Sequence, residues 1–187
     1  MGIVEAIETA TREISDEYFL LPVAGLERPI SRERVYCYEL YHQLRLALAQ
    51  TQTTLTLTAE PDKQGNPAFQ DSKEPNPDLI LHDPGAHENN NSVVEVECRP
   101  IKRHLIKDLS TLKLMQCKGY RHLVLLFFGI PKVPWPRIER AAEVAGLSLD
   151  EIIVLLHKVA GRSATQEKPD QLPNNAFKQI IGIGPIH

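Results

Sequence analysis

The chain has 187 residues, 42% of them hydrophobic and 24% charged, and a net charge of −3 at pH 7. This length and composition favour one α/β domain with a modest appendage, and the charge shows no overall basic excess of the kind that indicates nucleic-acid binding. Three cysteines without paired spacing argue against a disulfide framework and for a reducing compartment. The first residues lack the pattern of a signal peptide, and no apolar run approaches the length of a membrane span, so we expect a cytoplasmic protein.

Four apolar residues at helical spacing predict an amphipathic helix near the start of the chain: Ile3, Ile7, Ala10 and Ile14. The helix is expected to run for about four turns and to end before Pro22, with residues 23–30 as a connector. We expect residues 1–30 to pack on the surface of a core domain.

A second helix is predicted over residues 32–50, with Ser31 as its N-cap. It carries one apolar stripe that includes Cys37, and a second stripe on nearly the opposite side that includes Glu39 and Leu46. A helix that is apolar on two sides is expected to be largely buried. A carboxylate within such a stripe is costly without a partner, and Arg45 or His42 of the same helix is the simplest partner for Glu39.

Three short strands, a helix and a fourth strand follow. Residues 53–59 alternate polar and apolar side chains, and two β-branched and aliphatic runs occupy residues 78–82 and 93–98. Leucines at helical spacing predict a helix that ends near residue 118, and the apolar run at residues 122–128 is typical of a buried strand. A strand, a helix and a strand of these lengths predict a parallel pair in a mixed sheet.

Residues 131–187 are predicted to form a smaller extension. A proline-rich linker over residues 131–136 precedes two expected short helices, residues 137–145 and 148–159. From Gly161 onward the chain is polar and rich in proline and asparagine, so we expect an extended or partly disordered tail.

Acidic residues interrupt two of the predicted strands. Glu95 and Glu97 lie two residues apart, so their carboxylates share one strand face at a spacing of roughly 7 Å. Asp78 opens the preceding strand, and a hairpin would bring it beside them. Like charges this close disfavour joint ionisation unless a cation lies between them. The pattern therefore predicts a carboxylate cluster that holds a hard cation.

Charge is also segregated along the chain. Residues 60–97 carry a net charge of −7, and residues 99–122 carry +6. An acidic pocket beside a basic segment favours a metal-dependent enzyme that acts on a polyanion, although a solvated helix face is the simpler explanation of the basic residues. The residues expected to contact nucleic acid are Arg99, Lys102, Arg103, Lys107 and Lys118.

Pro77-Asp78, followed by an apolar run that ends in Glu95-Val96-Glu97, resembles the motif of the PD-(D/E)xK nuclease superfamily. The elements also come in that family's order. The resemblance implies an α/β restriction-endonuclease-like fold, with a mixed sheet and an α-β-β-β-α-β core over residues 31–130, flanked by helices and followed by a small helical C-terminal extension. It further implies that Asp78 and Glu95 bind Mg²⁺ or Mn²⁺, that Glu39 completes the metal site, and that the activity is phosphodiester hydrolysis.

One position departs from the family's pattern. Glu97 stands where the family usually has lysine, so it is expected to act as a general base or to bind a second metal ion. Arg99, Lys102 and Lys107 are the candidates to supply the missing cation. The expected partner is nucleic acid, DNA ahead of RNA; a homodimer is left open, and no membrane partner is expected.

Two other functions remain open at this point. A module that keeps the fold but no longer cuts would bind nucleic acid or a protein partner, and Glu97 favours it. A zinc protein would use His82, His87, Cys98 and His104, but these residues lack finger-like spacing and Cys98 is expected to face away from the carboxylates.

Overall fold

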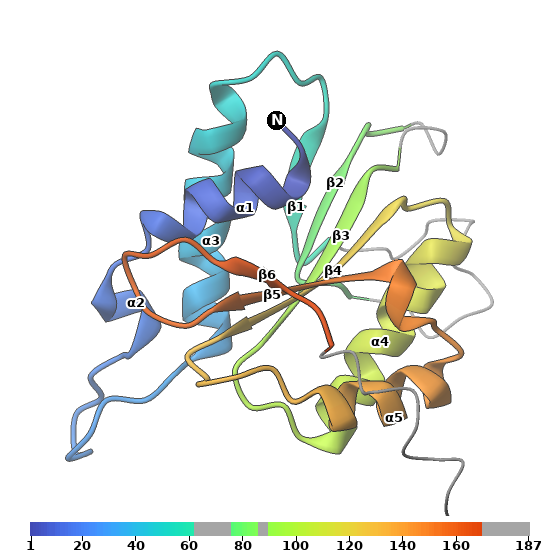
Figure 1. The fold of residues 1–187 in the computed structure, drawn as a ribbon. Helices are drawn as coiled ribbons and strands as arrows, with labels where there is room; N and C mark the ends of the chain where they lie inside the picture. The colour runs from blue at the N-terminus through green and yellow to red at the C-terminus, as the bar shows by residue number, and fades with distance from the viewer. Residues whose placement is uncertain (62–75, 86–89, 170–187) are drawn as a thin grey trace, which may run out of the picture.

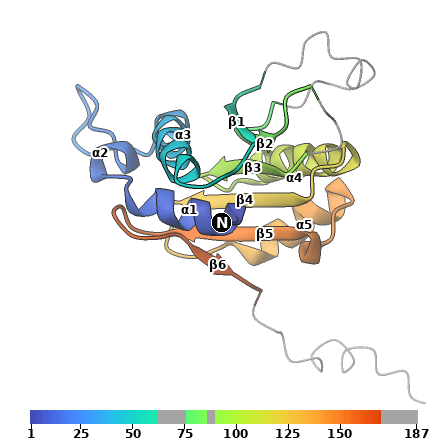
Figure 2. The ribbon, with the colours of Figure 1, turned by 90° about the horizontal axis from the view of Figure 1, so that it is seen from above.

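The computed structural model describes residues 1–61, 76–85 and 90–169, and a six-stranded mixed sheet forms its centre. The strands are β1 (Thr56–Ala59), β2 (Leu79–His82), β3 (Ser92–Glu97), β4 (His122–Phe128), β5 (Ile152–His157) and β6 (Thr165–Glu167). They lie side by side in chain order, as Figure 2 shows. β1, β2 and β3 pair antiparallel, β3, β4 and β5 pair parallel, and β6 returns antiparallel to β5.

Helices cover both faces of the sheet (Figure 1). One face packs against α1 (Ile3–Arg12), α2 (Asp16–Phe19) and α3 (Glu33–Ala49). The other packs against α4 (Lys102–Cys117) and α5 (Trp135–Ala145), which is followed by a short 3-10 helix (Leu149–Glu151). The expected mixed α/β sheet flanked by helices is confirmed. No helix within the described ranges has the length and apolar character needed to cross a membrane.

The two N-terminal helices differ from their predicted forms. The first stops at Arg12, because Ser15 takes an extended conformation that begins the separate helix α2. The second, α3, buries only the stripe that includes Cys37. Leu46, on the other predicted stripe, is 50% exposed, so α3 packs on one side and not on two.

The predicted helix over residues 148–159 is wrong. A 3-10 turn takes up residues 149–151, and Ile152 then starts β5, which pairs in parallel with the buried strand β4. Ile152, Ile153 and Val154 are β-branched, which favours a strand over a helix. Part of the expected tail forms β6, so residues 152–167 extend the same sheet. Within the described part of the extension, the helical residues are those of α5 and the short 3-10 helix. Residues 170–187 lie outside the described part of the chain.

Candidate functional site

The β2–β3 hairpin brings Asp78 and Glu95 together at one edge of the sheet. The antiparallel register pairs Leu79 with Val94, so one further step places Asp78, directly before β2, opposite Glu95. Residues opposite one another in an antiparallel pair point to the same face, with Cβ atoms about 5 Å apart. The backbone N–H of Val96 donates to Asp78 Oδ2 at 2.7 Å and fixes that carboxylate.

Glu95 is fully buried, with an exposed fraction of 0%. Within the described residues neither Oε1 nor Oε2 accepts a hydrogen bond, and the one side chain to which a protonated Glu95 can donate is the adjacent Asp78. Burial raises the pKa of Glu95 well above its usual range, and repulsion from Asp78 and Asp108 adds to that effect. Burial also raises the pKa of Asp78, against the opposing hydrogen bond from Val96. A buried carboxylate without a partner is costly, so Glu95 needs either a proton or a cation.

Glu97 lies on the same face of β3 as Glu95, because the intervening Val96 packs into the core on the α3 side. Both of its oxygens are engaged. His104 Nδ1 lies 2.9 Å from Oε2, and the backbone N–H of Arg99 donates to Oε1. His104 belongs to the first turn of α4, so Glu97 also places a negative charge where the helix dipole favours one. Hydrogen bonds from Arg99 and His104 therefore fix the carboxylate of Glu97. Glu95 accepts no such hydrogen bond from the described residues.

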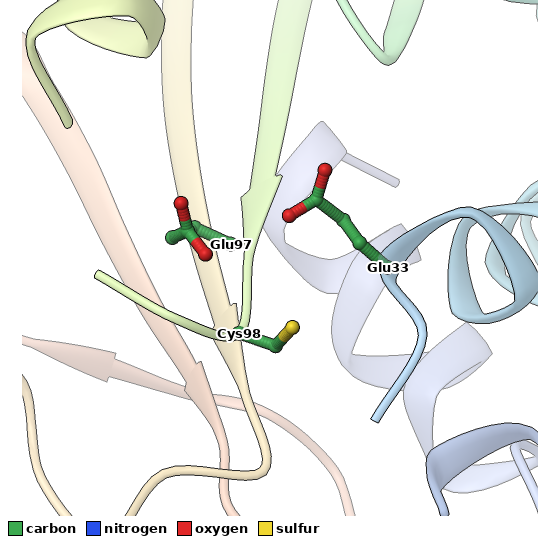
Figure 3. A group of neighbouring side chains, drawn as sticks. All are labelled: Glu33, Glu97 and Cys98. Atoms are coloured by element: carbon green, nitrogen blue, oxygen red, sulfur yellow. The ribbon is translucent and has the colours of Figure 1, made fainter. Parts of the chain in front are cut away.

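Glu33, in the first turn of α3, approaches the same edge of the sheet. Its carboxylate, that of Glu97 and the thiol of Cys98 each offer one ligand atom, and these atoms lie within 4.8 Å of one another (Figure 3). Burial raises the pKa of Glu33 to about 7, and repulsion from Asp78 and Glu97 contributes. Burial likewise raises the pKa of Cys98 to about 11, so its thiol keeps its proton at neutral pH and is a poor ligand for a hard cation.

Glu39, predicted for the metal site, is not brought to this group of carboxylates. It follows Cys37, which packs in the core, by two residues and therefore lies about 200° around the helix. Its Oε1 accepts a hydrogen bond from Gln43 at 2.6 Å. The stripe through Glu39 and Leu46 was predicted to be buried, whereas Leu46 on that side is half exposed. Glu33 is the glutamate of α3 that lies beside Glu97 and Cys98.

Lys107 and Asp108 approach from α4. Asp108 is only 4% exposed, and its Oδ1 lies 3.5 Å from Lys107 Nζ. Burial raises the pKa of Asp108 to about 7, against the attraction of Lys107. Burial lowers the pKa of Lys107, but attraction from Glu95 and Asp108 contributes to a net upward shift, so the ammonium stays charged.

Asp108 was not predicted as a site residue, because in the sequence it is only the single acid of a basic segment. Its spacing was a usable signal, since Asp108 follows Leu105 by three residues and therefore falls on the apolar stripe of α4. We refer to the five carboxylates at this edge of the sheet as the acid cluster: Glu33, Asp78, Glu95, Glu97 and Asp108.

The predicted basic patch is divided. Four of its members are exposed at or near the N-terminal end of α4: Arg99, Lys102, Arg103 and Lys107. No acidic residue occupies the first turn of α4, where cations oppose the helix dipole, so these residues are not placed there to stabilise the helix. Lys118 lies about three turns further along, roughly 16 Å from Lys107 along the axis, and its carbonyl accepts a hydrogen bond from Asn90.

Among the described residues of the zinc alternative, His82 lies apart from Cys98 and His104. His82 ends β2 at the edge of the sheet opposite to Cys98, and its Nε2 lies 3.3 Å from Thr58 Oγ1. His104 lies beside Glu97, and His87 falls outside the described residues. Cys98 packs into the core on the α3 side, but its thiol lies within 4.8 Å of carboxylate oxygens of Glu33 and Glu97, so the expectation that it faces away from the carboxylates is wrong.

No family model, no curated protein and no solved structure matches this chain. The fold and the acid cluster therefore carry the functional argument.

Proposed function

We propose that this protein is a metal-dependent nuclease of the PD-(D/E)xK type, which hydrolyses phosphodiester bonds in nucleic acid, with DNA as the first expectation. The observation that carries the proposal is the buried carboxyl group of Glu95, which faces Asp78 and accepts no hydrogen bond from the described residues. The chain order α3, β1, β2, β3, α4, β4 around that pair supports the same class.

The donors suit Mg²⁺ or Mn²⁺. Asp78 and Glu95 provide carboxylate oxygens, which these hard cations prefer, and Glu95 has both oxygens available. A bound ion would lower the pKa of an attacking water and offset charge that develops on the phosphate. Asp78 and Glu95 would hold the ion, and the protonated thiol of Cys98 would stay outside its ligand set.

Lys107 is the best candidate for the cation that the motif lacks at Glu97. Since the pKa of Lys107 is shifted upward, its ammonium holds its proton at neutral pH. A charged ammonium suits stabilisation of a phosphate or donation of a proton to the leaving oxygen, and does not suit removal of a proton from water. Asp108, 3.5 Å away, keeps the ammonium at the acid cluster.

Glu33 is the best candidate for the general base. It is only partly buried, and a pKa of about 7 lies where proton transfer at neutral pH is most effective. Glu97 had been expected in that role, but its two oxygens already accept hydrogen bonds from His104 and Arg99. We assign Glu97 to the support of α4.

A module that binds nucleic acid or a protein without cutting is the second candidate. The replacement of the motif lysine by Glu97, and the involvement of Glu97 in local hydrogen bonds, are the observations that favour it. Such a module needs no metal ion, so it would show neither cleavage nor a response to divalent cations.

A hydrolysis assay on duplex, single-stranded and branched DNA and on RNA tests the proposal. Cleavage should require Mg²⁺ or Mn²⁺ and should be lost in Asp78→Asn and in Glu95→Gln. Glu39→Gln is the matched control, because it removes a carboxylate of α3 that Gln43 holds away from the acid cluster. Cleavage that survives in both cluster variants would contradict the proposal. If no substrate is cleaved and the protein does not respond to metal, the non-cleaving binding module becomes the proposed function.

A further inference from the structure

A groove beside β5 and β6 lies outside the acid cluster and takes no part in the proposed chemistry. It has a volume of about 680 Å³ and is lined by the loop before α5, the first turns of α5, and the β5–β6 hairpin. The apolar part of its wall includes Pro134, Trp135, Pro136 and Leu156. Trp135 is only partly buried and is the single tryptophan of the chain.

The rim of the groove is basic. Four exposed cations line it: Lys132, Lys158, Arg162 and Lys168. Within residues 1–61, 76–85 and 90–169, none of the four has a carboxylate within 4 Å. Two carboxylates also line the groove, and one of them, Glu167, accepts a hydrogen bond from Thr165 Oγ1 at 2.8 Å. The groove therefore presents an excess of unpaired positive charge.

An aromatic ring among unpaired cations is the combination that binds single-stranded nucleic acid. Bases that are not paired can stack on an indole ring, and cations along the same groove neutralise the phosphates. Pro134 and Pro136 flank Trp135 and restrict the backbone on both sides of it. Trp135 also packs against the core on the α5 side, which limits the positions that its ring can take. A duplex keeps its bases stacked inside and would leave the ring unused.

The groove and the acid cluster share one edge of the sheet. β3, β4 and β5 run parallel, so their C-terminal ends meet there. Glu97 pairs with Phe127, and Phe127 pairs with Leu156 of the groove wall. Two strand spacings separate Glu97 from Leu156, about 10 Å between backbones. A strand bound in the groove would thus extend toward the acid cluster.

We propose that the groove lined by Trp135, Lys158 and Arg162 binds single-stranded nucleic acid, with a base on the indole ring and phosphates on the cations. The proposal rests on the proposed function in taking nucleic acid as the ligand. It adds a binding surface for the part of the strand that lies beside the scissile bond.

Trp135 provides the test, because its emission reports on the groove alone. The full chain is titrated in EDTA with an oligothymidylate of about 15 nucleotides, a length near the upper site sizes of single-strand grooves. Emission of Trp135 should be quenched on binding. Trp135→Leu, followed by anisotropy of a labelled oligonucleotide, should weaken binding roughly tenfold. Because EDTA prevents metal-dependent cleavage, the titration succeeds or fails independently of the nuclease proposal.

The salt dependence of oligonucleotide binding distinguishes binding in the groove from attraction to positive charge elsewhere on the surface. The double variant Lys158→Gln/Arg162→Gln should flatten the slope of log K against log salt by about 1.4, because each phosphate that a cation neutralises on a single strand adds about 0.7 to the slope. The control Arg45→Gln/Lys113→Gln removes the same charge elsewhere and should leave the slope unchanged. Melting temperatures within error of wild type would show that each variant is folded.

Three results would overturn the proposal. One is binding that leaves Trp135 emission unchanged, and another is an equal loss of slope in the groove and control variants. The third is a shift of Trp135 emission caused by Phe177→Ser in the full chain without oligonucleotide, together with no quenching by oligonucleotide. That result would make the chain's own C-terminal residues the occupant of the groove.

Discussion

β3 and β4 are equally buried neighbours, yet they present different side chains toward α4. Glu95 pairs with Leu125, and Glu97 pairs with Phe127; all four residues are at most 1% exposed. Leu125 and Phe127 gain free energy by leaving water, whereas Glu95 loses its hydration and accepts no hydrogen bond from the described residues. At these positions β4 therefore contributes to stability, whereas the buried carboxyl group of Glu95 on β3 lowers it.

The largest effect is expected on activity when the charge of β3 is removed. Glu95→Gln should lower metal-dependent cleavage by roughly 1000-fold or more, because it removes a ligand and a fixed charge from the reacting centre. Cleavage rates of wild type and variant under saturating Mg²⁺ measure the change. Glu39→Gln should cleave like wild type; an equal fall in both variants would mean that Glu95 has no special part.

The second largest effect is expected on stability when the apolar side chain of β4 is cut back. Leu125→Ala should lower the free energy of unfolding by about 3 kcal/mol, because it leaves a cavity in the core. Glu95→Ala in EDTA should lower it by clearly less, since the same truncation also removes an unpaired buried carboxylate. Urea titrations of both variants give the two values, and equal losses would contradict the comparison.

Lys107 provides a further test of the comparison between β3 and β4, because attraction from Glu95 on β3 contributes to the upward shift of the Lys107 pKa. Lys107→Gln should lower cleavage about 100-fold if its ammonium stabilises charge on the phosphate. Lys113→Gln, on the same helix but hydrogen-bonded to Gln116, is the matched control and should retain wild-type rates. If the Lys107→Gln rate equalled that of the control, the ammonium would have no part in the reaction.

Two buried titratable groups should give opposite pH dependences, on the order of 4 kcal/mol for Asp108 and on the order of 3 kcal/mol for His157. Burial raises the pKa of Asp108 from 3.8 to about 7, so the folded state loses stability as pH rises from about 4 to about 7. Burial lowers the pKa of His157 from 6.5 to about 4, so the folded state loses stability as pH falls across about the same range. The folded state binds the proton of Asp108 more tightly than the unfolded state does, and it binds the proton of His157 less tightly, which gives the two opposite signs.

Metal-free unfolding measured at pH 4 to 7 separates the two groups. Relative to wild type, Asp108→Asn should gain stability as pH rises, because asparagine does not ionise. His157→Gln should gain it as pH falls, although the hydrogen bond between Tyr36 Oη and His157 Nδ1 is disturbed at every pH. Parallel pH profiles for wild type and both variants would show that neither group is linked to folding.

The β2–β3 hairpin was predictable from sequence because alternation fixes which side chains share a face. The run Val93 to Glu97 places Glu95 and Glu97 together whatever the rest of the fold does. The helix and strand order from α3 to β4 was also correct. The apolar run from Ile152 was ambiguous, because a short continuous run suits a buried helix or a buried strand, and only pairing with β4 decides between them.

The helix residues of the acid cluster were harder to predict. Glu33 and Glu39 lie six residues apart on α3, so they differ in their position along the helix as well as in the side that they face. The side of α3 that meets the sheet is fixed by tertiary packing around Cys37. Asp108 is surrounded in sequence by basic residues, and its burial depends on the seating of α4 against β3 and β4. The groove beside β6 could not be foreseen, since the β5–β6 hairpin that lines it was not predicted.

The most direct test of the central claim is the melting temperature of wild type and Glu95→Leu, each in EDTA and in Mn²⁺. The claim is that Glu95 is buried without a partner in order to bind a cation. Leucine matches Leu125 of β4 and removes a carboxyl group that is costly to bury, so the variant should melt above wild type in EDTA. Mn²⁺ should raise the melting temperature of wild type alone. A variant that melts below wild type in EDTA, or that responds equally to Mn²⁺, would contradict the account.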